Sequence, residues 1–134
     1  MNILNQTRHK CNVSSVLNKD VKQFGKKFMF DGVDDTSWSS DQGIPQWISI
    51  QFEEDVTISS FLFQFQGGFA GKEVNVDVED FNGHKIYSDS HYPEDINKEQ
   101  TFKFRREISH VGKIKFTFPS STDFFGRIIV YKLE

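Results

Sequence analysis

The sequence predicts an all-β fold, an eight-stranded jelly-roll β-sandwich. Aromatic residues make up 15% of the 134 residues, mostly as 15 Phe, and aromatic side chains favour strands. About eight short segments alternate apolar and polar residues, which is the period of a strand with one buried face. Stretches rich in Gly, Pro, Asn and Asp separate these segments, as chain reversals require. A chain of this length fits one domain with a single core.

The first strand is predicted over residues 13–17, and one or two helical turns follow near residues 19–27. The remaining strands are predicted over residues 46–52, 60–66, 73–81, 84–88, 100–104, 113–118 and 127–133. Four of them should each direct three apolar side chains into the core, because every second residue of a strand lies on one face. These side chains are Ile48, Ile50 and Phe52, then Phe61, Phe63 and Phe65, then Val74, Val76 and Val78, then Ile114, Phe116 and Phe118.

The domain should fill residues 12–134, after a short flexible N-terminus over residues 1–11. The chain begins without the apolar run of a signal peptide, and no stretch reaches the roughly 20 apolar residues that cross a bilayer. Cys11 is the single cysteine, so no disulfide can form within the chain. We therefore expect a protein that is not secreted.

Several kinds of chemistry are not predicted. The net charge is -3 and the charges of both signs are interleaved, so there is no basic stripe for direct nucleic-acid binding. The four histidines lie far apart in the sequence, which does not favour a zinc site. Sequence motifs for a nucleophile elbow, a phosphate loop or a zinc protease are missing. The expectation is a protein without catalysis and without a cofactor.

The glycine-rich segment over residues 66–71 lacks the Lys-Ser/Thr of a phosphate loop. Gly67 and Gly68 allow a tight turn that would hold Phe69 at its tip. The alternative is that Phe69 folds back onto the core. Phe124 and Phe125 adjoin the entry of the last strand, where alternation directs neighbours to opposite faces. One of them should be buried and the other available to a partner.

Two resemblances follow from longer stretches. The segment FDGVDDTSWSSDQGIPQWISIQF (residues 30–52) resembles discoidin-like domains, also called coagulation factor five/eight C-type or galactose-binding-like domains. Shorter segments resemble, in the same order, the small family of orphan nuclear receptor (testicular receptor four) associated proteins. They are SSVLN, QFGKK, SDQG, QFQGGF, YPED and TDFFGR followed by VY, between residues 14 and 131.

The first resemblance raises the question of calcium. Discoidin-like domains that bind calcium use an Asp and a Thr in this loop, which implies Asp31 and Thr36, and a Glu from the last strand. Here Arg127 stands in place of that Glu, and a guanidinium repels a metal ion and attracts carboxylates. We therefore expect a structural pair of Arg127 with Asp31 or Asp35, with Trp38 packed beneath it. Calcium is the alternative if Asp34 and Asp35 turn inward.

The second resemblance implies a protein–protein interaction module. Its function would be to repress an orphan nuclear receptor by keeping the receptor from its DNA response element, as a monomer in the nucleus and also in the cytoplasm. Aromatic side chains with a basic rim suit a partner surface. The residues predicted for that surface are Phe24, Lys26, Lys27, Phe69, Lys72 and Phe124.

The alternative function is a carbohydrate- or small-ligand-binding module. Asp41 and Gln42 would then hydrogen-bond a sugar, and Trp47 or Phe69 would stack on it.

Overall fold

The computed structural model describes residues 2–134 and confirms the all-β jelly roll. Within these residues, no helix is long and apolar enough to cross a membrane. The short helices are η1 (Ile3–Asn5), η2 (Leu17–Lys19), α1 (Val21–Phe24) and η3 (Lys26–Met29). The strands are β1 (His9–Val13), β2 (Trp38–Ser39), β3 (Gln46–Phe65), β4 (Val74–Glu79), β5 (Lys85–His91), β6 (Glu99–Phe118) and β7 (Ile129–Leu133).

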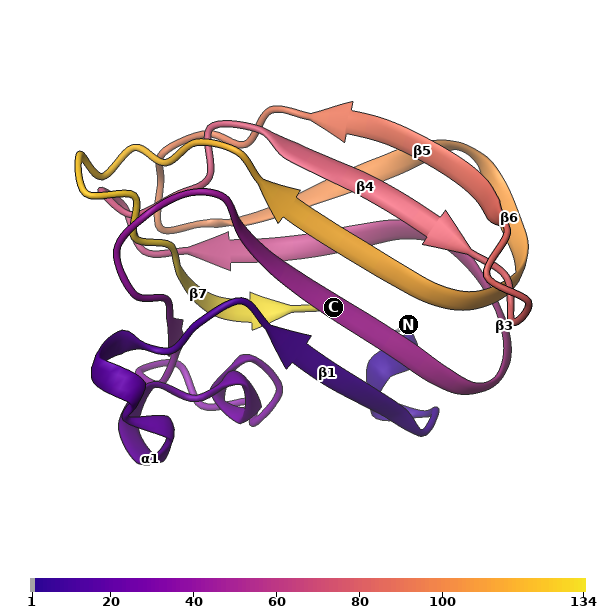
Figure 1. Ribbon diagram of the computed structural model, residues 1–134, viewed down its shortest axis with the longest axis horizontal. Helices are drawn as coiled ribbons and strands as arrows, with labels where there is room; N and C mark the ends of the chain where they lie inside the picture. The colour runs from indigo at the N-terminus through magenta and orange to yellow at the C-terminus, as the bar shows by residue number, and fades with distance from the viewer. Residues whose placement is uncertain (1) are drawn as a thin grey trace.

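The two longest strands, β3 and β6, belong to both layers of the sandwich. The first part of β3 pairs with β1 on one side, through residues 48–52, and with residues 113–118 of β6 on the other, through residues 46–51. Its last part pairs with β7 and with the first part of β6. In Figure 1 both strands bend at the right-hand end of the molecule and return in the second layer. One layer therefore reads β1-β3-β6-β4-β5, and the other is formed by β2, β7, the last part of β3 and the first part of β6.

This arrangement corrects the predicted number of strands. Residues 46–52 and 60–66 were expected as two strands, and so were residues 100–104 and 113–118. Each pair is one continuous strand, because register shifts between Gln51 and Ser60 let the ladder bend without ending. The predicted core faces are confirmed, since every inward side chain named for the four alternating strands is at most 5% exposed.

Phenylalanine rings join the two layers. Phe63 lies at the centre, with ring centroids 5.2 Å from Phe65, 5.2 Å from Phe116 and 5.6 Å from Phe118. Edge-to-face and offset arrangements at such distances are the favourable ones for aromatic pairs. The high Phe content of the sequence thus serves the core.

The first strand differs from its prediction. β1 begins at His9, inside the segment expected to be a flexible N-terminus, and ends at Val13, where the strand was expected to begin. The chain leaves the sheet at Ser14 and Ser15, whose hydroxyls donate to the side-chain oxygen of Gln46. The predicted helical turns are confirmed by α1, whose start is capped by Asp20.

Candidate functional site: an aromatic tip between two loops

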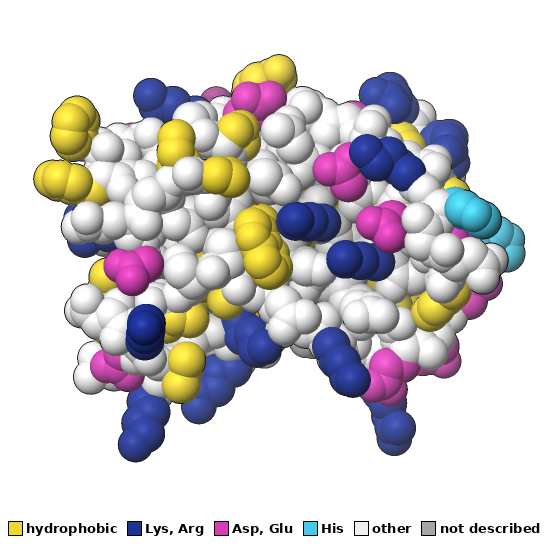
Figure 2. Space-filling model, viewed as in Figure 1, with side chains coloured by type: hydrophobic (Ala, Val, Ile, Leu, Met, Phe, Trp, Pro, Cys, Tyr) yellow, Lys and Arg dark blue, Asp and Glu magenta, His cyan; other side chains and the backbone are white. Residues whose placement is uncertain are grey.

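Three apolar side chains stand in solvent where the loop before β3 meets the loop before β7. Phe124 is 94% exposed, Ile44 57% and Phe125 54%. The two Phe rings meet edge to face with centroids 5.3 Å apart. We name these three residues the aromatic tip. Figure 2 shows hydrophobic side chains projecting from this left-hand end of the molecule, and exposed apolar groups of this kind mark interaction surfaces.

The backbone of the two loops fixes the aromatic tip. The Gly43 N–H donates to the carbonyl of Phe125 at 2.8 Å. Gly126 has φ +82°, and a Cβ there would lie 3.0 Å from the backbone of Gly43. Because glycine alone combines this conformation with such a close approach, the sequence positions the tip as a firm platform.

An ion pair closes the loop behind the aromatic tip. The Arg127 Nε donates to the Asp123 Oδ2 at 3.1 Å, and the Arg127 backbone N–H donates to the same oxygen at 3.1 Å. Burial raises the pKa of the Asp123 carboxyl, but the hydrogen bonds from Arg127 and its charge outweigh this, so the pKa lies below its usual range. The pair thus holds Phe124 and Phe125 between two fixed residues.

This geometry shows that the predicted pair of Arg127 with Asp31 or Asp35 is wrong. Asp123 lies four residues before Arg127 in the same loop and reaches both its side chain and its backbone. Trp38 is not beneath such a pair either. It is fully buried, and its indole N–H donates to the Ser15 carbonyl at 2.9 Å.

Phe69 takes neither of its two predicted positions fully. It is half-buried, and the Arg127 guanidinium lies 4.9 Å from its ring centroid. A cation over an aromatic face is an attractive arrangement, so Arg127 links the glycine-rich loop to the aromatic tip. Lys72 is exposed beside the tip, and its backbone N–H donates to the Ser120 carbonyl.

The expectation that one of Phe124 and Phe125 is buried is wrong, since both are exposed. The strand begins only at Ile129, so the two rings lie in a loop where alternation does not apply. The sequence prediction also missed Ile44 and Asp123. An apolar residue between Gly43 and Pro45 was the available signal for Ile44, and an acid four residues before an arginine was the signal for Asp123.

The predicted partner surface divides into two separate groups. Phe69, Lys72 and Phe124 lie around the aromatic tip. Phe24, Lys26 and Lys27 belong instead to α1 and η3, which Figure 1 places at the lower corner of the molecule, away from the loop before β7. A single compact surface does not contain all six.

The acidic loop after η3 is closed by its own hydrogen bonds. The Thr36 hydroxyl donates to the Asp31 Oδ2 at 2.6 Å, and the Val33 N–H donates to the Asp31 Oδ1 at 3.0 Å. Asp34 and Asp35 are exposed. In the part of the chain that the structure describes, no three His, Cys, Asp or Glu side chains are grouped to hold a metal ion. This geometry favours a structural role for the loop.

We expect calcium to leave the thermal unfolding midpoint of this protein unchanged relative to a chelator. Asp31→Ala should lower the free energy of unfolding by about 1 kcal/mol, because two loop donors lose their acceptor. Asp34→Ala is the control and should change little, since within residues 2–134 the Asp34 side chain, unlike that of Asp31, accepts no hydrogen bond. Differential scanning fluorimetry measures both. A midpoint that rises with calcium in the wild type and not in Asp31→Ala would contradict this prediction.

The residues considered for sugar binding are not gathered in one pocket. Trp47 lies on the outer sheet face with the Lys115 Nζ 4.9 Å from its ring centroid. Phe69 is covered by Arg127, and the Asp41 carboxylate accepts from the Gln42 N–H. Each predicted stacking ring therefore already carries a cation on one face.

Comparisons with known proteins give the family. The F5/8 type C domain matches residues 11–128. A protein of Danio rerio called "Nuclear receptor 2C2-associated protein" is 48% identical over 132 residues, which are 98% of this chain and 92% of that protein. Its namesake in Homo sapiens is 42% identical over 124 residues, which are 91% of this chain and 86% of that protein. The chain belongs to the F5/8 type C domain family, in the group of Nuclear receptor 2C2-associated proteins.

Solved structures agree with this F5/8 type C assignment at the level of the fold. A family 32 carbohydrate-binding module from Clostridium perfringens, solved with galactose, has a TM-score of 0.75 at 19% identity. The match covers 93% of this chain and 90% of the carbohydrate-binding module. An F5/8 type C domain from Bacteroides fragilis has a TM-score of 0.78 at 14% identity, over 93% of this chain and 88% of its own. The jelly roll of the receptor-associated group is thus the one used by sugar-binding modules.

Proposed function

We propose that this F5/8 type C domain is a non-catalytic protein–protein interaction module that binds a nuclear receptor through its aromatic tip. The observation that carries the proposal is the exposure of Phe124 and Phe125 on a platform fixed by Gly126 and the Arg127–Asp123 pair. The names of the 42–48% identical relatives supply the class of partner.

The chemistry of the aromatic tip suits a protein surface. Aromatic side chains carry much of the binding free energy of interfaces when a partner covers them. The platform is already ordered, so little conformational entropy is lost on association. Lys72, which is exposed and bonded through its backbone to Ser120 of the loop before β7, provides a cation for acidic groups of the partner.

The mechanism proposed is occlusion. By covering the receptor, the domain keeps it from its DNA response element, and for this the domain need not touch DNA itself. Its place of action is the nucleus, with the cytoplasm as a second location. A catalytic role for the single cysteine is disfavoured, because burial raises the pKa of the Cys11 thiol to about 12, against the smaller opposing effect of Lys26.

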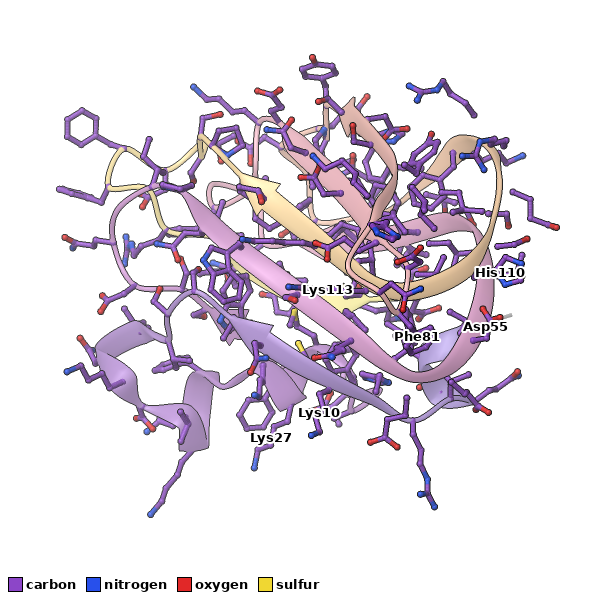
Figure 3. The ribbon with its side chains drawn as sticks, turned by 45° about the vertical axis from the view of Figure 1, so that its right-hand side comes forward. Lys10, Lys27, Asp55, Phe81, His110 and Lys113 are labelled. Atoms are coloured by element: carbon purple, nitrogen blue, oxygen red, sulfur yellow. The ribbon has the colours of Figure 1, made fainter. Side chains whose placement is uncertain are left out.

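The test is binding of the purified domain to the purified receptor by isothermal titration calorimetry. We expect Phe124→Ala/Phe125→Ala to weaken binding by at least about tenfold, the effect of losing an interface hot spot. Phe81→Ala is the matched control, because Phe81 is 53% exposed and lies with Asp55 and His110 at the opposite end of the molecule (Figure 3). Equal affinities of all three proteins would overturn the proposal.

Two further experiments test the occlusion mechanism and the carbohydrate-binding alternative. In a gel-shift assay, the wild type should remove receptor from a labelled response element, whereas Phe124→Ala/Phe125→Ala should not. Galactose added to the calorimeter cell tests the carbohydrate alternative. Binding of galactose that competes with the receptor would favour that alternative over a dedicated protein surface.

A further inference from the structure

One edge of the sandwich is open. β1 pairs only with β3, so it forms the border of its layer. The Ser14 N–H donates to Trp47 and the Arg8 carbonyl accepts from Glu53, which shows that the even-numbered residues of this segment bond to β3. The backbone groups of Cys11 and Val13 therefore point outward, and within residues 2–134 they make no hydrogen bond.

The opposite border of the same layer is protected. There, the Arg105 guanidinium donates to the Ser88 carbonyl at 3.1 Å, and the Arg106 guanidinium donates to the Ile86 carbonyl at 3.1 Å. Two arginines thus occupy the acceptors of β5 that another strand would need. Proteins commonly protect strand edges in this way, so the unprotected edge of β1 is a specific difference between the two borders.

An apolar groove with a cationic rim lies beside the open edge. Val13, Val16 and Val21 line it, together with Lys22, Lys26 and Lys27. Val21 is 60% exposed, although a valine at this position gains nothing from contact with water. The lining contains no acidic side chain. The groove therefore offers apolar contact and positive charge together, in a chain whose net charge is -3.

The groove is built by specific local contacts. A Cβ on Gly25 would lie 2.5 Å from the Val21 carbonyl oxygen, so glycine is required where α1 passes into η3. The indole N–H of Trp38 donates to the carbonyl of Ser15, the residue before Val16. These contacts keep the wall of the groove at a fixed distance from β1.

Lysines also lie on the outer face next to the edge. Lys10 is opposite Gln51, and Gln51 is opposite Lys113, so the three form one row across the sheet. Figure 3 shows Lys10, Lys27 and Lys113 on the same side of the molecule. A strand added to β1 would direct alternate side chains to this face and to the groove.

We infer that the edge of β1 binds an extended acidic peptide segment of a partner protein by strand addition. Apolar side chains of the segment enter the groove at Val13, Val16 and Val21, and its acidic side chains face the lysines. The free backbone groups select an extended peptide over a helix. The apolar floor selects a peptide over a nucleic acid. This site is separate from the aromatic tip and does not depend on the proposed receptor.

The test selects a ligand and then maps it. Phage-displayed random peptides of about twelve residues are selected on the immobilised domain, and we expect enrichment of sequences that alternate acidic and β-branched apolar residues. One enriched peptide is then labelled, and its affinity is measured by fluorescence polarisation. Hydrogen exchange of the Cys11 and Val13 amides should slow when this peptide is bound.

Four variants locate the peptide. Lys26→Glu/Lys27→Glu and Cys11→Pro should each weaken binding by at least about tenfold, the first by reversing charge and the second by removing an outward N–H. Lys98→Glu/Lys103→Glu is the control for net charge, and Phe124→Ala is the control for the aromatic tip. Both should leave the affinity within about twofold. Far-ultraviolet circular dichroism confirms that each variant is folded.

Several results would overturn the inference. One is a selection that yields no alternating acidic peptides, and another is an enriched peptide that binds Cys11→Pro as tightly as the wild type. Loss of binding in Phe124→Ala instead would assign the peptide to the aromatic tip. Tighter, lysine-dependent binding of a single-stranded DNA of equal length would assign the groove to nucleic acid.

Discussion

Trp38→Ala is expected to lower the free energy of unfolding by about 3–5 kcal/mol, the range for removing a large aromatic side chain from a core. Trp38 is fully buried and pairs with Val130 across β2 and β7. Its indole N–H also donates to the Ser15 carbonyl. The substitution therefore removes a hydrogen bond that positions the wall of the β1 groove as well. Urea unfolding followed by circular dichroism measures the change.

Two variants make this experiment specific. Trp47→Ala removes the second tryptophan, which is half-buried on the outer sheet face, and should cost about 1 kcal/mol or less. Trp38→Phe keeps an aromatic ring but leaves the Ser15 carbonyl without its donor, which should cost about 1–3 kcal/mol. If Trp38→Ala were no more destabilising than Trp47→Ala, Trp38 would not hold the position described for it.

Arg127→Ala is expected to destabilise the protein by about 2–3 kcal/mol at neutral pH, less than for a fully buried pair because both side chains reach solvent. The substitution leaves the Asp123 carboxylate, whose side chain is only 12% exposed, without its cation. It also uncovers Phe69. Urea unfolding of Arg127→Ala, Asp123→Asn and the double variant gives the coupling between the two side chains.

The destabilisation should depend on pH in one direction. Because the pKa of Asp123 in the folded protein is below its usual value, the pair stabilises the fold above about pH 4 and this contribution is lost as the pH falls through the lower folded value. The difference between wild type and Arg127→Ala should therefore shrink in acid. Lys132→Ala, which breaks the more exposed pair with Glu99, is the control and should cost under about 1 kcal/mol. A difference that grows in acid would be incompatible with this ion pair.

The core was predictable because a strand has a fixed period. Phe61, Phe63 and Phe65 face inward for the reason inferred from the sequence, namely that every second residue shares a face. Strand boundaries were less predictable. Residues 46–52 and 60–66 were predicted as two strands, whereas register shifts carry β3 through the residues between them.

The candidate site was only partly predictable, since it depends on loop geometry. Arg127 was predicted to pair with Asp31 or Asp35, but its partner is Asp123, which lies only four residues before it in the chain. The exposure of Phe125 follows from where β7 begins: the strand starts only at Ile129, so Phe124 and Phe125 both lie in the loop before it. The groove beside β1 forms because α1 and η3 fold back toward this strand. The alternation of apolar and polar residues does not predict the path of such short helices.

The sharing of β3 and β6 between both layers also bears on how the chain reaches its fold. Gln46 pairs with Phe118, so the central ladder forms only after a long stretch of chain has closed into a loop. Neither layer can be completed without the other, and therefore no half of the sandwich is a folding unit by itself. We expect a single cooperative folding step on a timescale of about milliseconds to seconds, as in other proteins dominated by distant pairings.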